Sequence, residues 1–154
     1  MLSKQELKER NTVFWDEFKS FMSGTRSSTG KRINWLNYPT AIKYVFLRLE
    51  ADKQGARINF DIQAKDAGVR EVMWEQMEEL KKVLTDSMGE PGDWNFNSRS
   101  DSIASFCRIS WEKQGVNFFD EKDKQSIFEF FRDKLIAFDE FYQNFKEILV
   151  LLSK

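Results

Sequence analysis

Histidine is absent from this 154-residue chain, and cysteine occurs once, at Cys107. Without imidazole the chain cannot build a Ser-His-Asp or Cys-His nucleophilic system, a histidine general base or a zinc site with histidine ligands. A single thiol excludes an intrachain disulfide and a cysteine metal cluster, and it favours a reducing compartment. Because Cys107 lies in the apolar stretch 103–109, we interpret it as a small core residue rather than a reactive thiol. We expect no cofactor.

The net charge is also small, and long apolar runs are absent. The 24 Lys and Arg nearly cancel the 25 Asp and Glu, which leaves a net charge of -1. This excludes a chain-wide basic coat for nucleic acid or for a membrane surface, so that only local patches remain. No window approaches the roughly 20 apolar residues of a membrane span, and the charged N-terminal stretch does not resemble a signal peptide. We therefore expect a cytoplasmic protein without a membrane partner.

Apolar and aromatic residues are abundant instead. Hydrophobic residues make up 41% and aromatic residues 15%, with 15 Phe and 5 Trp, which is too apolar for a disordered chain. At this length folding buries roughly 70% of the surface of the unfolded chain. Residues 1–154 are therefore predicted to form a single domain with its own core.

Three stretches have helical periodicity. Ser3 and Glu6 form a capping-box pattern, which predicts a helix over 4–22, and Asp66 is a good N-cap for a second helix that ends near 88. The third helix, 123–152, would be about 45 Å long at about 1.5 Å per residue, longer than the width of a globule of this size. With Phe on several of its faces, we expect this helix either to break or to meet a partner, and we predict a homodimer through it.

Short alternating stretches predict strands. Residues 44–50 and 57–64 are joined by a turn at 52–55, and 94–97 and 103–110 follow later, with 116–119 as the candidate for a fifth strand. The order of the elements predicts an α+β fold. We expect a mostly antiparallel sheet of four or five strands, with helices packed on one face and a long C-terminal helix.

Residues 23–39 have no period and are rich in Ser, Thr, Gly and basic residues, which predicts a long loop that is either functional or mobile. Cations attract phosphates, and exposed aromatic faces stack on bases. The candidate nucleic-acid-binding residues in and just after this loop are Arg26, Lys31, Arg32, Trp35, Tyr38 and Lys43. The alternative is a solvated loop in which Trp35 and Tyr38 fold back into the core.

Acidic residues on neighbouring strands form a second candidate site. Glu50 and Asp61 could hold a divalent metal as in PD-(D/E)XK nucleases, where hard oxygen ligands converge on the ion and a lysine stabilises charge. Gln63 stands where that lysine is expected. The alternative is an ordinary cross-strand ion pair between Glu50 and Arg57.

The order of several short patterns resembles a bacterial domain family of unknown function. The patterns are Phe14-Trp15-x-x-Phe18, Asn34-Trp35, the strand 56–61, Gly89 followed by Trp94, and the stretch 108–119 with the Phe-rich helix after it. Members of that family stand alone or follow a nuclease-like PD-(D/E)XK domain. The resemblance implies a role near nucleic-acid transactions and brings no catalytic motif with it.

The hypothesis that combines these patterns is a non-catalytic binding domain that contacts nucleic acid or a nucleic-acid-processing protein. Two alternatives remain open at this point. One is a divergent metal-dependent nuclease that uses Glu50 and Asp61, and the other is a protein–protein adaptor.

Overall fold

The computed structural model describes residues 2–154 and confirms the α+β class. Four helices, four strands and one short 3-10 helix follow one another along the described chain. Their bounds are α1 (Lys4–Met22), β1 (Val45–Ala51), β2 (Gly55–Ile62), α2 (Ala67–Glu79), α3 (Lys81–Met88), β3 (Asp93–Ser98), β4 (Phe106–Gln114), η1 (Glu121–Asp123) and α4 (Lys124–Leu152).

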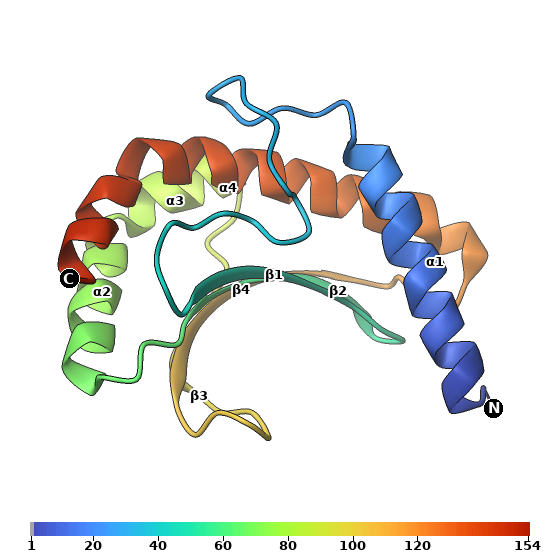
Figure 1. Cartoon of the computed structure of the whole chain (residues 1–154), viewed down its shortest axis with the longest axis horizontal. Helices are drawn as coiled ribbons and strands as arrows, with labels where there is room; N and C mark the ends of the chain where they lie inside the picture. Colours follow the sequence, from blue (N-terminus) through green and yellow to red (C-terminus); the bar gives the residue numbers. More distant parts are fainter. Residues whose placement is uncertain (1) are drawn as a thin grey trace.

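The four strands form one antiparallel sheet in the order β1-β2-β4-β3. Figure 1 shows that the sheet is strongly curved, with α3 and α4 above its convex face and α1 and α2 at its two ends. The alternation in β2 sets the two faces: Ile58 and Phe60 point to the helices, while Asn59 and Asp61 point to the concave face. The helices therefore cover one face of the sheet, as the sequence predicts.

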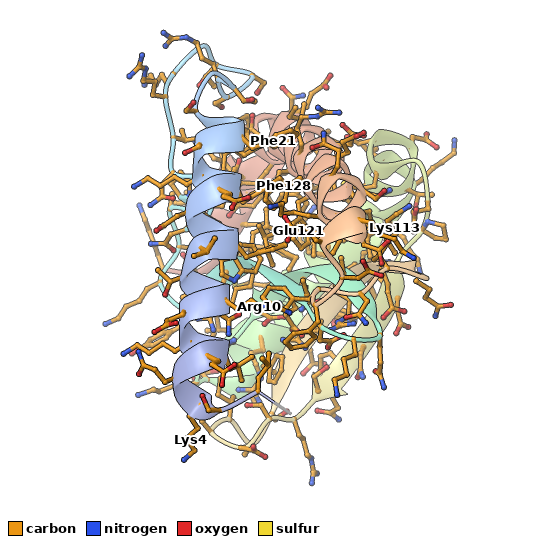
Figure 2. All side chains as sticks on the ribbon, turned by 90° about the vertical axis from the view of Figure 1, so that its right-hand side faces the viewer. Lys4, Arg10, Phe21, Lys113, Glu121 and Phe128 are labelled. Carbon is orange, nitrogen blue, oxygen red and sulfur yellow. The ribbon has the colours of Figure 1, made fainter. Side chains whose placement is uncertain are left out.

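Helix α4 is continuous and passes over the whole sheet (Figure 1). Its aromatic residues are covered by the protein's own chain, because α1, α2 and α3 all pack against it. Figure 2 shows α1 beside the start of α4, where the Phe21 and Phe128 ring centroids lie 5.4 Å apart. The helix neither breaks nor needs a partner to bury its Phe residues. The homodimer through α4 stays a prediction, but the need to bury the Phe residues of this helix in an interface no longer supports it.

Two local predictions are wrong. The helix expected from Asp66 to 88 is two helices, because Leu80 leaves the helical region with φ -91° and ψ 3°. This change of direction lets α3 pack against α4 while α2 stays at the end of the sheet. The stretch 116–119 is not a strand: Val116 and Phe118 are buried in alternation, but the segment makes one backbone bond to the sheet turn, from Phe118 N to Asp52 O (3.0 Å).

Cys107 lies on the helix-facing side of β4 and is fully buried, which confirms its predicted place in the core. Burial raises the pKa of its thiol to about 11, so the thiolate is scarce at neutral pH. Across residues 2–154, no helix combines the length and the apolar composition that crossing a bilayer requires.

Candidate functional site

Residues 23–43, which we call the basic segment, are fastened to α4 by a buried carboxylate. Asp139 is 1% exposed and accepts hydrogen bonds from Ser27 Oγ (3.0 Å), the Ser28 backbone N–H (2.7 Å), Tyr38 OH (2.6 Å) and Gln143 Nε2 (3.2 Å). Burial, together with the Asp139 charge, raises the pKa of Tyr38, so its hydroxyl stays protonated and donates. One side chain of α4 thus holds two separate parts of the basic segment.

Between these two anchors the chain forms a closed turn. The Gly30 N–H donates to Ser27 O (2.8 Å) and the Ser27 N–H donates to Lys31 O (2.9 Å). Gly30 has a φ of +82°, which glycine adopts without steric cost. Arg26 Nη1 also donates to Gly30 O (3.3 Å). Arg26 and Lys31 therefore stand as exposed side chains on the two sides of a hydrogen-bonded turn.

An apolar hollow of about 370 Å³ lies between the end of α1 and residues 32–36. We call it the α1 pocket. Its walls are formed by Phe18, Lys19, Met22, Ser23, Thr25, Arg32, Ile33, Asn34, Trp35 and Leu36. Phe18, Met22 and Trp35 are buried, whereas Lys19 and Arg32 are exposed. The Trp35 indole N–H donates to Thr25 O (3.0 Å), which fixes the ring in the wall.

The cations around the α1 pocket have no acidic partners. Lys19, Arg26, Lys31 and Arg32 are all exposed, and among residues 2–154 none of the four takes part in an ion pair. Their charge is therefore not neutralised within the described fold. An anionic ligand in the α1 pocket would meet Lys19 and Arg32 in its wall, with Arg26 and Lys31 in the adjacent turn.

The structure brings together only part of the predicted binding site. Arg32 and Trp35 line the α1 pocket, and Arg26 and Lys31 flank the adjacent turn. The alternative expectation, that both aromatic rings fold back into the core, is confirmed. Trp35 is 5% and Tyr38 4% exposed, so neither offers a free face for stacking. The α1 contribution was missed, because the periodicity of Phe18 and Met22 indicates burial without showing what covers them.

Lys43 lies apart from the other predicted cations. Its ammonium sits 5.2 Å from the Tyr44 ring centroid, and Lys65 contacts the same ring at 5.5 Å. Both lysines line a different hollow, between the start of β1 and the start of α2. Lys43 therefore does not belong to the surface around the α1 pocket.

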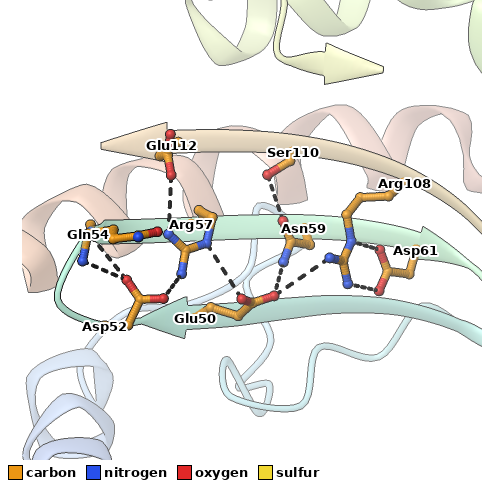
Figure 3. A network of polar contacts seen from close by, with 10 residues as sticks. Glu50, Asp52, Gln54, Arg57, Asn59, Asp61, Arg108, Ser110 and Glu112 are labelled. Atoms are coloured by element: carbon orange, nitrogen blue, oxygen red, sulfur yellow. Dashed lines mark hydrogen bonds and ion pairs between the residues drawn. The ribbon is translucent and has the colours of Figure 1, made fainter. Parts of the chain in front are cut away.

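The second candidate site, on the concave face of the sheet, is a network of paired charges (Figure 3). Arg57 contacts three carboxylates: Glu50 at 3.5 Å, Glu112 at 3.1 Å, and Asp52. Burial by itself would lower the pKa of Arg57, but the bonds to Asp52 and Glu112 outweigh it and the pKa is raised. The cross-strand pair expected between Glu50 and Arg57 is confirmed, both in register and in contact.

Glu50 and Asp61 lie on the same face of the sheet and both contact Arg108 (Figure 3). Asp61 accepts from Arg108 Nε at 2.7 Å and from Nη2 at 2.9 Å, and Glu50 lies 3.8 Å from Nη1. The bond to Asp61 is the main reason why the pKa of Arg108 is raised. A guanidinium thus occupies the position between the two carboxylates.

A metal in this place would need two or three oxygen ligands that converge on one point. Arg108 already engages both carboxylate oxygens of Asp61, and Gln63 Nε2 donates a longer bond to one of them (3.4 Å). Residues 2–154 contain no group of three or more His, Cys, Asp or Glu side chains arranged to hold a metal ion. The nuclease hypothesis remains untested, but the donor set does not fit a resident divalent ion.

The family model of the Domain of unknown function (DUF4268) matches residues 11–146. The chain belongs to this family. The expectation of a family of unknown function is thereby confirmed. No curated protein and no solved structure matches the chain.

The DUF4268 match begins within α1 and ends within α4. It includes the α1 pocket, the Asp139 anchor and the concave network. Both candidate sites are therefore parts of the DUF4268 domain itself.

Proposed function

We propose that the protein binds single-stranded nucleic acid, with one base in the α1 pocket and the neighbouring phosphates against the cations of α1 and the basic segment. The observation that carries this proposal is an apolar hollow of about 370 Å³ that has two unpaired cations, Lys19 and Arg32, in its wall and two more, Arg26 and Lys31, in the adjacent turn. Ligand pockets in proteins typically measure about 300–1,000 Å³ and combine an apolar lining with a few polar groups.

The apolar wall suits a base rather than a small inorganic anion. The half-buried Ile33 and Leu36 offer carbon surface in the pocket, above the buried Phe18, Met22 and Trp35. Removing the apolar face of a base from water against such a wall is favourable in proportion to the area buried and depends little on which base is present. The pocket therefore supports binding with little sequence preference.

The unpaired cations suit the phosphates that follow the base along a strand. Arg26, Lys31 and Arg32 occupy a turn that the Asp139 bonds hold in place. Because the segment is already ordered, little conformational entropy is lost when a ligand binds. Binding should weaken as salt rises. The logarithm of the binding constant should fall with the logarithm of the salt concentration, with a slope of about -0.7 for each phosphate of the single strand that the protein neutralises.

Fluorescence anisotropy with a labelled oligothymidine tests the proposal. We expect Arg26→Ala/Lys31→Ala/Arg32→Ala to weaken binding at low salt and to flatten the salt dependence. The matched control, Lys4→Ala/Lys8→Ala/Arg99→Ala, removes the same charge from exposed positions away from the pocket and should leave both unchanged. Absence of binding at low salt, or equal loss in the two triple variants, overturns the proposal.

The role of the pocket is tested separately from that of the charges. An oligonucleotide that consists of abasic sites should bind about tenfold more weakly than oligothymidine, as expected for the loss of about 1.4 kcal/mol of apolar contact with the base. Ile33→Ala should reduce this difference without changing the salt dependence. Equal affinity for the abasic strand would mean that the surface holds polyanions only and that no base enters the pocket.

A further inference from the structure

The outer edge of β1 carries an inference that does not depend on the proposed binding of nucleic acid. In its antiparallel pairing with β2, Tyr44 O accepts from Gln63 N and Asp52 N donates to Gly55 O. Backbone hydrogen bonds alternate along an antiparallel pair, so the backbone N–H and C=O groups of residues 46, 48 and 50 also point to β2. The backbone groups of Leu47, Leu49 and Ala51 point away from the sheet, and no residue of 2–154 bonds to them.

The chain closes both ends of this edge but leaves its middle free. Val45 N donates to Ile42 O (3.2 Å) and Val45 O accepts from Thr40 Oγ1 (2.8 Å). At the other end, Asp52 O accepts from Phe118 N (3.0 Å). Proteins normally protect a free strand edge with proline, bulges or charge, because it is a template for another strand.

We propose that two copies of the chain pair through their β1 edges, antiparallel, about a two-fold axis at Leu49. In this register Leu49 bonds to Leu49 of the second copy, and Leu47 bonds to Ala51 of the second copy. Each of the three outward N–H groups and each of the three outward C=O groups then has a partner. The two sheets join into one, and the apolar side chains of the edge meet apolar side chains.

The side chains on the concave face select this register. It places Arg48 directly opposite Glu50 of the second copy, twice by symmetry. A shift by one residue in each copy places Arg48 opposite Arg48, or Glu50 opposite Glu50, and like charges directly opposite each other destabilise strand pairs. Arg48 is exposed and forms no ion pair within residues 2–154, and the Glu50 side chain is 45% exposed despite its contacts.

A hollow of about 450 Å³ lies beside the middle of this edge and is lined by residues 46–49 together with Trp15, Leu36 and Asn37. Trp15 and Leu36 are half-buried and offer apolar surface. The hollow and the unpaired backbone groups therefore lie at the same edge of the sheet.

Sedimentation of the full chain over a micromolar concentration series tests the dimer. We expect the wild type to approach twice 18.3 kDa, and Arg48→Glu to raise the dimer dissociation constant at least about tenfold, because like charges then face each other twice. Arg99→Glu makes the same charge change at an exposed residue far from β1 and should leave the constant unchanged.

A mixing experiment tests the register. Arg48→Glu and Glu50→Arg should each dimerise poorly alone, yet form a heterodimer when mixed, since each variant supplies the charge that the other lacks. Because Glu50 also contacts Arg57 and Arg108, a second measurement covers the case in which Glu50→Arg does not fold. In the wild type, amide exchange at Leu47, Leu49 and Ala51 should slow as protein concentration rises.

Three results overturn the proposal. One is a monomer throughout the concentration series, which would leave the edge to an extended peptide of another protein or to solvent. Another is a dimer that Arg48→Glu leaves intact. The third is a dimer whose Leu49 amide exchanges as fast as in dilute solution, which would point to another interface such as α4.

Discussion

Two buried aspartates in this protein are stabilised in different ways. Asp61, on the concave face of the sheet, is 0% exposed and is held by the guanidinium of Arg108. Asp139, under the basic segment, is 1% exposed and receives only neutral donors, from hydroxyl, amide and backbone N–H groups. Both carboxylates are fully bonded, so the difference lies in which groups remain free around them.

That difference separates the two candidate sites. On the sheet, Arg57 and Arg108 are occupied by carboxylates of the same face, so their charge contributes to the fold. Around the α1 pocket, neutral donors hold the segment and the cations of the segment are left without partners. The comparison teaches that the number of Lys and Arg residues in a region does not locate a binding surface, because only the unpaired ones are available to a ligand.

The largest effect is expected on the sheet. Arg108→Met leaves the buried Asp61 carboxylate without its cation, and breaking a buried pair in this way costs about 3–5 kcal/mol. Urea denaturation at neutral pH measures the free energy of unfolding. Adding Asp61→Leu to the variant should recover most of the loss, because a buried pair can be replaced by apolar groups at little cost. A loss below about 1 kcal/mol for the single variant would contradict the assigned role of the pair.

A smaller effect is expected at the Asp139 anchor. Tyr38→Phe removes one donor to the carboxylate and should cost about 1.5–3 kcal/mol, the range for hydrogen bonds to charged groups. Tyr142→Phe is the matched control, since its hydroxyl donates to the neutral Thr40 O (2.7 Å) and its loss should cost about 0.5–1.5 kcal/mol. Denaturation gives both values, and amide exchange should rise in the basic segment of Tyr38→Phe. Equal losses would mean that Asp139 is no special anchor.

The stability of the protein at acid pH should depend on Asp52, which belongs to the charge network on the concave face of the sheet. Burial would raise the pKa of Asp52, but bonds from the Gln54 and Gly55 amides and from Arg57 outweigh it, so the pKa is lowered. Its stabilisation is therefore present above the ordinary value of 3.8 and is lost as pH falls through the lower folded value. Asp52→Asn should flatten this acid-side decline in thermal melts.

The decline attributed to Asp52 should be smaller than the effect of either buried group, because its side chain is 49% exposed and screened by solvent. Asp101→Asn, at an exposed carboxylate without a hydrogen bond in the described chain, is the control and should leave the acid-side profile unchanged. A profile that is equally steep in Asp52→Asn would assign the decline to other groups.

The smallest effect on stability is expected from the cations of the basic segment. Because Arg26, Lys31 and Arg32 form no ion pair, each substitution by Ala should change the free energy of unfolding by no more than about 0.5 kcal/mol. Denaturation of the three single variants checks this. A larger loss would show that these side chains serve the fold, and the contrast between the two regions would disappear.

Elements that depend on neighbouring residues were predictable from the sequence. The capping box at the start of α1 forms as expected, with the Glu6 N–H donating to Ser3 Oγ at 3.1 Å. The alternation in β2 assigned Ile58 and Asp61 to opposite faces of the sheet. The break at Leu80 and the loss of a strand at 116–119 were not predictable, because both follow from how α3 and residue Phe118 pack against distant elements.

The candidate site shows the same division. The basic character of residues 26–32 is visible in the sequence, whereas the contribution of Lys19 and Phe18 required α1 to meet residues 32–36 in space. The role of Tyr38 also changed, from a surface for stacking to a donor inside the core, because its partner Asp139 is 101 residues away.

By itself, the sequence determined α1, α4, the approximate positions of the four strands and the classes of chemistry that a chain without histidine and with one cysteine cannot perform. Those properties depend on residue type and on spacings of a few positions. Only the tertiary structure decided which charges are neutralised and which stay free. Ion pairs and buried hydrogen bonds join residues that are far apart in the chain, such as Ser27 and Asp139 at a separation of 112, and no local pattern records such a contact.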